Sequence, residues 1–581
     1  AAPLAFSPSQ AQAQLVDRTQ APNPADEGIA LSLEEQVGAG QGDEFTPDSS
    51  IYLIKRDPAR AIRRGRQLFQ RKFTHAQGLG PRSGDLVGDN ADRLAKLLRR
   101  AGITHPSNQA SSRRAKHHSK RFRRHSGRHG GRLGGRLARK IIRALGPNQF
   151  AQEGIGDIST NIAIGAGLAD SCAACHGRPR GSAGFGGDVA TRPDSRDAPH
   201  LFGLGLQEQL ADEMTARLRE IRTQSLRDAA ESGGPISVAL EAKGISFGTI
   251  TANADGTLDT SQVEGIDPDL RVRPFFAEGS TMSIREFVVG AFNDEMGLQS
   301  FDPCLFDAAS GGICTTPAGM VLDGITDPVK GPPLSSANED GDGDLVVNEI
   351  DPALVDFMEF YLLNYFKPGL GQQTAATDAG FQTMEDIGCT SCHVRDLTID
   401  SDRRVADVET VYDPENGIFN RLFATAETRF TALDDGESLP QLLPTGEAFV
   451  VENIFTDFKR HDLGPNFYEL NYDGSLQTHF ITEPLWGVGS TSPYGHDGRS
   501  INLTEVILRH GGEAEDTALA FEALPEQDRQ NILTALNSLI LFPPDDTASN
   551  LNPGDPDDPD FPQIGHGSIN LGALFQTEGP E

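Results

Sequence analysis

The stretch Gly167–Gly181, GLADSCAACHGRPRG, contains two cysteines three positions apart with a histidine directly after the second. Cys172, Cys175 and His176 match C-x-x-C-H, the attachment site of a c-type haem. On one helical turn both thiols can bond to the haem, and the imidazole that follows can ligate the iron. The same residues could also form half of a zinc site.

A second copy of the motif, Cys389, Cys392 and His393, lies in DIGCTSCHVRD at residues 386–396. A zinc site would need further Cys or His pairs at ligand spacing, and the only other cysteines are Cys304 and Cys314. The two copies therefore predict two covalently bound c-type haems.

The composition, the first residues of the chain and the haem motifs together predict an exported protein. The 581 residues could form about three or four domains. The 51 basic and 83 acidic residues give a net charge of -32, which argues against nucleic acid as a partner. No run of 18 apolar residues occurs, so we expect no transmembrane span. The chain begins AAPLAFSPSQ, and haem is attached to C-x-x-C-H outside the cytoplasm, so we expect a cleaved signal peptide and a periplasmic, secreted or cell-surface location.

In an oxidising compartment Cys304 and Cys314 are predicted to form a disulfide. Two unpaired thiols are the alternative.

We expect a mainly α-helical fold in which two cytochrome c-like haem domains carry long loops, a small β-hairpin and a calcium-binding insertion. The predicted organisation is an extended arm at 1–50, an N-terminal haem domain at 51–330 with a basic insertion at 111–145, a calcium loop and helix at 331–372, a C-terminal haem domain at 373–545, and an acidic Pro-rich tail at 546–581.

The segment 113–143 is strongly basic, with thirteen Lys or Arg, four His and no acidic residue. One interpretation is a solvated insertion that lies against the acidic body of the same chain. A second is a tether to an anionic surface or partner. A four-histidine metal site is a third alternative.

Hydrophobic periodicity predicts helices at 204–231, 283–297, 352–366 and 524–542. Alternation predicts a β-hairpin at 245–265, with its turn at 253–256.

The stretch NEDGDGDLVVNE, residues 338–349, fits the twelve-residue EF-hand loop. Asn338, Asp340 and Asp342 take positions one, three and five, Asp344 takes position seven and Glu349 closes the site at position twelve. These residues predict a structural calcium site between the haem motifs. The alternative is an acidic surface turn.

From about residue 63 to 542, without the basic insertion, the chain resembles the bacterial di-haem cytochrome c peroxidase superfamily. This superfamily includes the di-haem oxidoreductases, the methylamine-utilisation di-haem enzyme and the di-haem rubber oxygenases. The resemblance depends on the two C-x-x-C-H motifs and on RDAPHLFGLGL at 196–206, FTDFKRHDLGP at 455–465 and TEPLWGVGSTSPYGHDG at 482–498.

The resemblance implies that His176 and His393 are the proximal iron ligands. In the family the C-terminal haem takes its sixth ligand fourteen positions after the PYxHDG histidine, often a methionine. Here that histidine is His496, and His510 stands fourteen positions later, which implies bis-histidine ligation and a lower potential than with methionine. A helix-terminal histidine is the alternative for His510.

The resemblance also implies that the N-terminal haem keeps an open distal face, where the family's catalytic glutamate falls on Glu295. A carboxyl there can take a proton from one peroxide oxygen and give it to the other. The alternative is a surface carboxylate. The chain departs from the peroxidases at Arg285, where they have glutamine, and at Phe275 and Phe276, where they have a tryptophan between the haems. We therefore predict Arg285 as a second catalytic residue and Phe275 as a haem contact.

The only tryptophan, Trp486, is predicted to contact a haem, either as a replacement relay or, by ordinary packing, in the core. His200 could be a removable distal ligand or a hydrogen-bonding residue at the haem edge.

The resemblance implies a peroxidase that reduces hydrogen peroxide at the N-terminal haem, with electrons from a small cytochrome c or cupredoxin relayed by the C-terminal haem. A haem oxygenase or oxidase acting on a polymer, hydrocarbon or protein is the first alternative, because the two phenylalanines make the pocket apolar. A non-catalytic electron carrier in a redox assembly is the second.

Overall fold

The computed structural model describes residues 15–17, 33–73, 77–78, 169–178, 182–186, 188–189, 196–341, 346–415, 422–471, 474–541 and 567–569. The basic segment 113–143, most of the N-terminal arm and of the C-terminal tail, and the predicted calcium ligands Asp342 and Asp344 lie outside these residues.

The described residues form these helices: α1 (Leu33–Val37), α2 (Ser50–Arg56), α3 (Pro58–Gln70), α6 (Cys172–His176), α7 (Leu204–Ser232), α8 (Ile284–Met296), α9 (Pro303–Ala309), α10 (Pro352–Leu363), α11 (Ala375–Asp386), α12 (Leu503–Arg509), α13 (Glu515–Ala523) and α14 (Glu526–Asn537), with 3-10 turns η3 (Cys389–Ser391) and η4 (Gly512–Ala514).

All strand pairs are antiparallel: β1 (Leu15–Asp17) with β21 (Gly567–Ile569), β2 (Asp188–Val189) with β3 (Arg196–Asp197), β4 (Ile236–Ala242) with β5 (Ile245–Ala252) and β5 with β6 (Leu258–Val263), β7 (Ile313–Thr315) with β8 (Val321–Asp323), β9 (Gly369–Leu370) with β20 (Leu539–Ile540), β10 (Leu397–Ile399) with β15 (Phe449–Val451), β11 (Ala406–Tyr412) with β12 (Leu422–Thr428), β13 (Phe430–Leu433) with β14 (Gln441–Pro444), β16 (Arg460–Asp462) with β19 (His479–Ile481), and β17 (Glu469–Leu470) with β18 (Leu476–Gln477).

The fold is mixed, which corrects the prediction of a mainly α-helical protein. Within the described residues, twelve α-helices are accompanied by ten small sheets of two or three strands. Segments expected as long loops form short strand pairs instead, such as β13 with β14 and β10 with β15. Backbone N–H and C=O groups that leave water need hydrogen-bond partners, and a short antiparallel pair supplies them without a long strand.

Helix α10 forms the centre of the largest hydrophobic core. Every residue from Ala353 to Leu363 is buried, which is the pattern of a helix enclosed on all sides. Asp351 caps the helix by accepting a hydrogen bond from the N–H of Ala353. Helix α3 crosses α10 closely at Gly65, where a Cβ would lie 2.3 Å from the carbonyl oxygen of Phe357.

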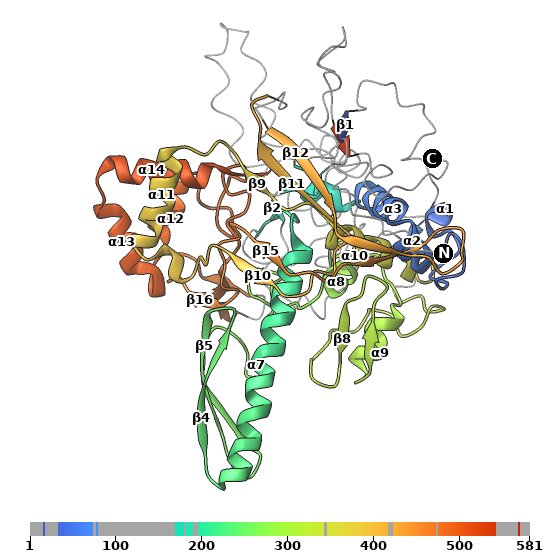
Figure 1. Cartoon of the computed structure of the whole chain (residues 1–581), viewed down its shortest axis with the longest axis horizontal. Coiled ribbons are helices and arrows are strands. Elements are labelled where there is room, and N and C mark those ends of the chain that lie inside the picture. Colours follow the sequence, from blue (N-terminus) through green and yellow to red (C-terminus); the bar gives the residue numbers. More distant parts are fainter. Residues whose placement is uncertain are drawn as a thin grey trace, which may run out of the picture.

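Helix α7 extends from the body as a long arm (Figure 1). Its 29 residues span about 44 Å at 1.5 Å per residue. The sheet β4–β5–β6 packs along it, and Leu240, Phe247 and Ile250 are buried in the same core cluster as Leu218. The hairpin predicted at 245–265 is confirmed as β5 and β6, whereas strand β4 was not predicted.

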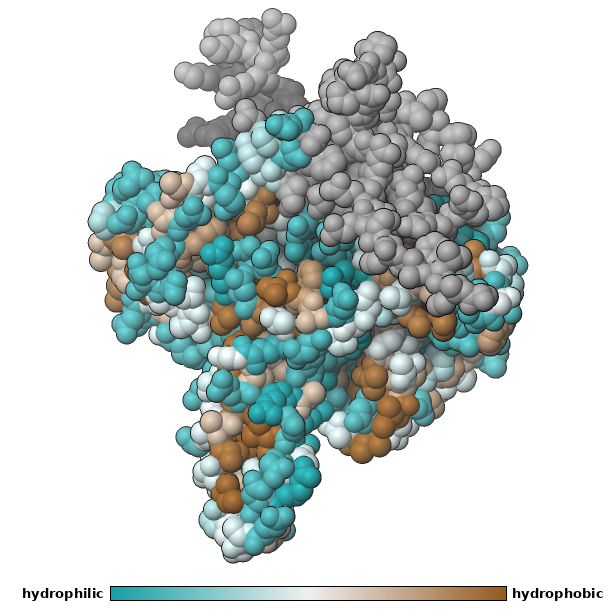
Figure 2. All heavy atoms as spheres, in the orientation of Figure 1, coloured by the Kyte–Doolittle hydropathy of each residue, from teal (hydrophilic) through white to brown (hydrophobic). Residues whose placement is uncertain are grey.

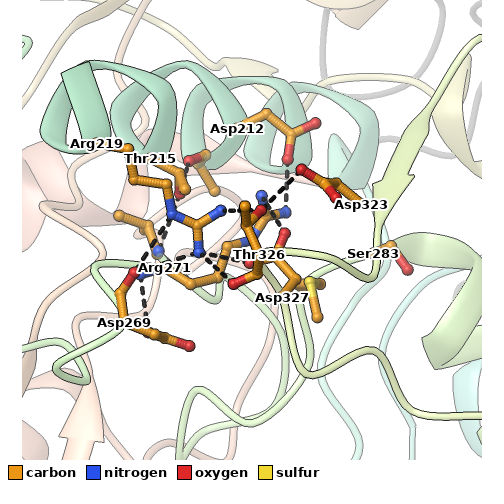
Figure 3. A network of polar contacts seen from close by, with 12 residues as sticks. Asp212, Thr215, Arg219, Asp269, Arg271, Ser283, Asp323, Thr326 and Asp327 are labelled. Carbon is orange, nitrogen blue, oxygen red and sulfur yellow. Dashed lines mark hydrogen bonds and ion pairs between the residues drawn. The ribbon is translucent and has the colours of Figure 1, made fainter. Parts of the chain in front are cut away.

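The base of the arm is anchored by a network of ion pairs (Figure 3). Arg271 contacts Asp212 of α7 at 2.6 Å and Asp327 at 3.6 Å, while Arg219 of α7 contacts Asp327 at 2.6 Å. Asp212 also contacts Arg403, 3.0 Å away, in the segment that follows the second haem motif. The arm is therefore fixed at its base to segments far apart in the sequence.

Helices α11 to α14 lie together on one side of the molecule (Figure 1). Gly380 of α11 lets α14 approach, since a Cβ there would lie 2.1 Å from the carbonyl oxygen of Asn531. The predicted helices at 204–231, 283–297, 352–366 and 524–542 are confirmed as α7, α8, α10 and α14.

A small unit of α9, β7 and β8 contains the disulfide between Cys304 and Cys314, whose Cα atoms lie 5.4 Å apart, so this prediction is confirmed. Apolar side chains gather on its surface (Figure 2), including exposed Phe306, Val321 and Ile325. Among the described residues, none of the helices combines the length and the apolar character needed to cross a membrane.

Candidate haem sites

The first C-x-x-C-H motif forms the one-turn helix α6, which places Cys172 and Cys175 on the same face. Neither thiol forms a disulfide. His176 Nδ1 lies 2.7 Å from the carbonyl oxygen of Pro199. Because a carbonyl oxygen only accepts hydrogen bonds, Nδ1 carries the proton and donates, which leaves the lone pair of Nε2 available to a metal.

The second motif has the same hydrogen-bond pattern on a different backbone. Gly388, in the left-handed region at φ 92°, precedes the 3-10 turn η3 that carries Cys389. His393 Nδ1 donates to the carbonyl oxygen of Phe455 at 3.0 Å. Phe455 itself has a φ of 55°, which is rare for a bulky residue and turns this carbonyl toward the histidine.

His510 is brought close to His393. It caps the C-terminal end of α12, and its Nδ1 donates to the carbonyl oxygen of Val506 at 2.7 Å. Burial lowers the pKa of His393 to about 4, and the neighbouring His510 contributes to this shift. Three histidines predicted as iron ligands therefore share one feature, an Nδ1 held by a main-chain carbonyl, and the His176 ring also has a main-chain partner at Gly184. This arrangement fits haem ligation.

Glu295 lies beside the first motif, at the C-terminal end of α8. The N–H of Ala169 donates to the carbonyl oxygen of Glu295 at 3.2 Å, which joins the helix end to the segment that leads into α6. Burial and, next, the charge of Glu295 raise the pKa of the Cys175 thiol to about 11. Among the described residues, Glu295 Oε2 is buried without a hydrogen-bond partner. Burial and the adjacent Asp294 raise the pKa of Glu295 to about 8.

Arg285 has a different place from the one predicted. Its guanidinium is fully buried and contacts Asp302 at 2.6 Å, Glu359 at 2.7 Å and Asp356 at 2.9 Å. With its nitrogens engaged by three carboxylates, Arg285 has no N–H directed at a substrate, which argues against a catalytic role. It joins α8 to α10 and to the disulfide unit.

Phe275 and Phe276 lead into α8. Phe275 is buried, whereas Phe276 is 44% exposed and has a φ of 60°. Both rings pack against Phe287, with centroids 6.1 Å and 5.3 Å away. This segment is apolar, as the sequence suggested.

Trp486 is only 2% exposed and belongs to a core cluster, and its Nε1–H donates to the carbonyl oxygen of Glu452 at 3.2 Å. His200 Nε2 lies 2.7 Å from the carbonyl oxygen of Trp486, and the N–H of Phe202 donates to His200 Nδ1 at 3.2 Å. Burial lowers the pKa of His200 to about 4. Both ring nitrogens of His200 are thus engaged, as expected for a hydrogen-bonding residue and not for a removable ligand.

The described part of the EF-hand-like loop includes Asn338, which is exposed, and Glu349, which is buried and accepts a hydrogen bond from the N–H of Gln299. The Oε1 atom of Gln299 is buried and, among the described residues, has no hydrogen-bond partner. It lies against Gly341, where a Cβ would be 2.4 Å away. Among the described residues, no three carboxylate, Cys or His ligand atoms gather at this loop, and Asp342 and Asp344 lie outside them, so the calcium site stays a prediction.

His461 is a residue that the sequence reasoning missed, although it lies within FTDFKRHDLGP. Its Nδ1 is 2.8 Å from Glu513 and its Nε2 is 3.0 Å from Asp457. Burial opposes a charge on this ring, but the contacts with Asp457, Cys392 and Glu513 outweigh it and raise the pKa to about 11. A cationic imidazole therefore lies near the second motif. The only available signal was its place in a motif rich in His and Asp.

Comparison with known proteins supports the reading of the second site. Residues 365–539 match the family described as "Di-haem oxidoreductase, putative peroxidase". No curated protein matches the chain. Among solved structures, the chain is similar to hydrazine synthase of Kuenenia stuttgartiensis pressurized with 20 bar xenon, at 16% identity and a TM-score of 0.20, a value that supports no argument. That similarity covers 33% of this chain and 57% of the other. The matched segment contains the second C-x-x-C-H motif and His510, so residues 365–539 are similar to the di-haem oxidoreductase family.

Proposed function

We propose that this chain is a di-haem c-type oxidoreductase that reduces hydrogen peroxide at the first site with electrons relayed by the second. The observation that carries the proposal is the difference between the two sites. His393 interacts with His510. The histidine that interacts with His176 is His200, whose ring nitrogens are both engaged, and the other group beside the first motif is Glu295, whose buried Oε2 has no hydrogen-bond partner among the described residues.

Cys172, Cys175 and His176 would hold the first haem, and Cys389, Cys392, His393 and His510 would hold the second. The haems would supply one-electron redox chemistry, with peroxide binding at the first.

The remaining steps belong to the chain. Glu295, with a pKa of about 8, keeps its proton near neutral pH and can exchange it with a peroxide oxygen at the first site. His510 closes the second site to small ligands and reserves it for electron transfer.

The second candidate is an oxygenase or oxidase of a hydrocarbon, polymer or protein substrate. It is favoured by the phenylalanines, because Phe276 presents 44% of its surface. Phenyl rings also transfer electrons less readily than the indole that the peroxidases have there.

Partners, location and the second cofactor follow from the same proposal. The disulfide supports an oxidising compartment, and therefore export to the periplasm or the cell surface. The electron donor would be a small cytochrome c or cupredoxin. Calcium would occupy the 338–349 loop. The basic segment 113–143 would contact an anionic surface or partner.

The proposal is tested on purified protein expressed with the machinery for haem attachment. Mass spectrometry and the pyridine haemochrome spectrum should give two covalent haems per chain, and Cys→Ser pairs at 172 and 175 or at 389 and 392 should each remove one. Stopped-flow spectra should change with stoichiometric peroxide only when the first haem is present. A stable dioxygen adduct with negligible peroxide turnover would favour the oxygenase, and an absence of haem would refute both.

A further inference from the structure

The Pro199 carbonyl that orients His176 lies in an irregular segment. Its immediate neighbours are held by two hydrogen bonds, from the N–H of Gly186 to the carbonyl of Ala198 at 3.1 Å and from the N–H of Leu201 to the carbonyl of Ala183 at 2.9 Å. The carbonyl of Pro199 shares its peptide plane with the N–H of His200. The next side chain, His200, is therefore in a position to set the direction of this carbonyl.

Both ring nitrogens of His200 have partners whose roles are fixed. The Trp486 carbonyl only accepts, so Nε2 of His200 carries the proton and donates at 2.7 Å. The Phe202 N–H only donates, so Nδ1 of His200 accepts at 3.2 Å. The ring packs edge-on against Phe202, with centroids 5.9 Å apart. These contacts define one tautomer and one orientation of the ring.

The acceptor side is rigid as well. The indole of Trp486 is buried and is held at Glu452 by its own Nε1–H. The ring fills the space at Gly203, where a Cβ would lie 2.5 Å from its Cζ3 atom. The N–H of Leu485 donates to the carbonyl of Ile454 at 3.0 Å, directly before the Phe455 carbonyl that holds His393. The Leu485–Trp486 segment, whose Trp486 carbonyl accepts the hydrogen bond from His200, is thus linked to the segment that holds His393.

We propose that His200 is a positioning residue for the first haem, holding the Pro199 carbonyl against His176 Nδ1 by its bond to the Trp486 main chain. A hydrogen bond donated from Nδ1 makes the ligating nitrogen a stronger electron donor. The proximal ligand of the first site is therefore set by a segment from the second. This inference rests on the proposed attachment of haem at Cys172 and Cys175.

The test uses two polar substitutions of the haem-loaded full chain. In His200→Gln the amide nitrogen can occupy the place of Nε2 and still reach the Trp486 carbonyl. In His200→Asn the amide lies at the place of Nδ1 and falls short of it. Spectroelectrochemistry of each haem is the readout, and His479→Gln, at an exposed histidine, is the matched control.

We expect His200→Asn to make the first haem easier to reduce, with about a tenfold higher ratio of reduced to oxidised haem at a fixed potential. His200→Gln should restore the ratio, and the second haem should not respond. No shift in His200→Asn, equal shifts in both variants, or parallel shifts of both haems would overturn the inference. If His200→Asn does not accumulate, His200→Ala gives the same comparison. The haemochrome spectrum separates this failure from a failure of the proposed function, because the latter would show no covalent haem at the first motif.

Discussion

Single atoms decide what each candidate site can do. At Glu295 one buried carboxyl oxygen has no hydrogen-bond partner among the described residues, and the group holds a proton near neutral pH. We expect Glu295→Gln to retain both haems and to reduce peroxide turnover by about 10²- to 10⁴-fold, the scale of a lost acid–base group. Steady-state kinetics with a reduced cytochrome c measures this effect.

Glu437→Gln, at an exposed carboxylate, provides a control for the same chemical change. Equal turnover in Glu295→Gln and the unsubstituted protein would remove this carboxyl from the chemistry.

His510 should make the two haems unequal. A haem held by His393 and His510 should be low-spin. The first haem should be high-spin or hold water, because both ring nitrogens of the nearby His200 are engaged by the main chain. Electron paramagnetic resonance of the oxidised protein should show the two signals in about equal amounts. His510→Gly should convert only the low-spin signal, and added imidazole should restore it. Two low-spin signals that survive this substitution would contradict the assignment.

Elements are joined by buried charge, and this makes stability depend on pH. Burial raises the pKa of Glu359 from an ordinary 4.5 to about 7, despite its contact with Arg285. The folded protein therefore binds a proton that the unfolded chain releases between these values, so this contribution to stability is complete below about pH 4.5 and is lost as the pH rises through 7.

We expect Glu359→Gln to make the free energy of unfolding less dependent on pH between about 4.5 and 7, as measured by denaturant titration. Glu437→Gln, at an exposed carboxylate, is the control. An unchanged slope in Glu359→Gln would show that another group causes the dependence.

The EF-hand-like loop connects the disulfide unit to α10. Removal of a bound cation lowers stability by mass action, by about 2.7 kcal/mol where the cation had been at a hundred times its Kd. Excess chelator should lower the melting temperature, and Glu349→Gln should abolish the difference between chelated and calcium-saturated protein. If elemental analysis detects no calcium and the melting temperature does not change when chelator is added, the loop is an acidic turn and not a calcium site.

For the whole molecule, short motifs predicted more of the candidate haem sites than the amino-acid composition did. The spacing of Cys and His located both haem motifs, and the resemblance brought His510 to His393. Neither the spacing nor the resemblance predicted that the carbonyls of Pro199 and Phe455 accept hydrogen bonds from the histidines of these motifs. The direction of a main-chain carbonyl cannot be inferred from the spacing of side chains along the sequence.

The ion pairs of Arg285 could not be predicted from the sequence for a related reason. Its partners Asp302, Asp356 and Glu359 lie 17 to 74 positions away, and only the folded chain brings them together. Many short strands were not predicted either, in part because some of their pairing partners are also distant in the sequence. The strands of the fold are two to eight residues long, and some, such as β9 and β20, pair across most of the C-terminal half of the chain.

The free energy needed for local unfolding should decrease along helix α7, from its base to its C-terminal end. Leu206, Leu210, Met214 and Leu218 are buried at its base, whereas beyond Ala229 the helix ends at two successive glycines, Gly233 and Gly234, with open space around them. Amide hydrogens near the base should therefore exchange only with larger unfolding events, and those near the end should exchange through fraying. Hydrogen–deuterium exchange followed by mass spectrometry should resolve this order along one helix. A uniform rate would mean that helix α7 and the sheet β4–β5–β6 that packs along it open as one cooperative unit.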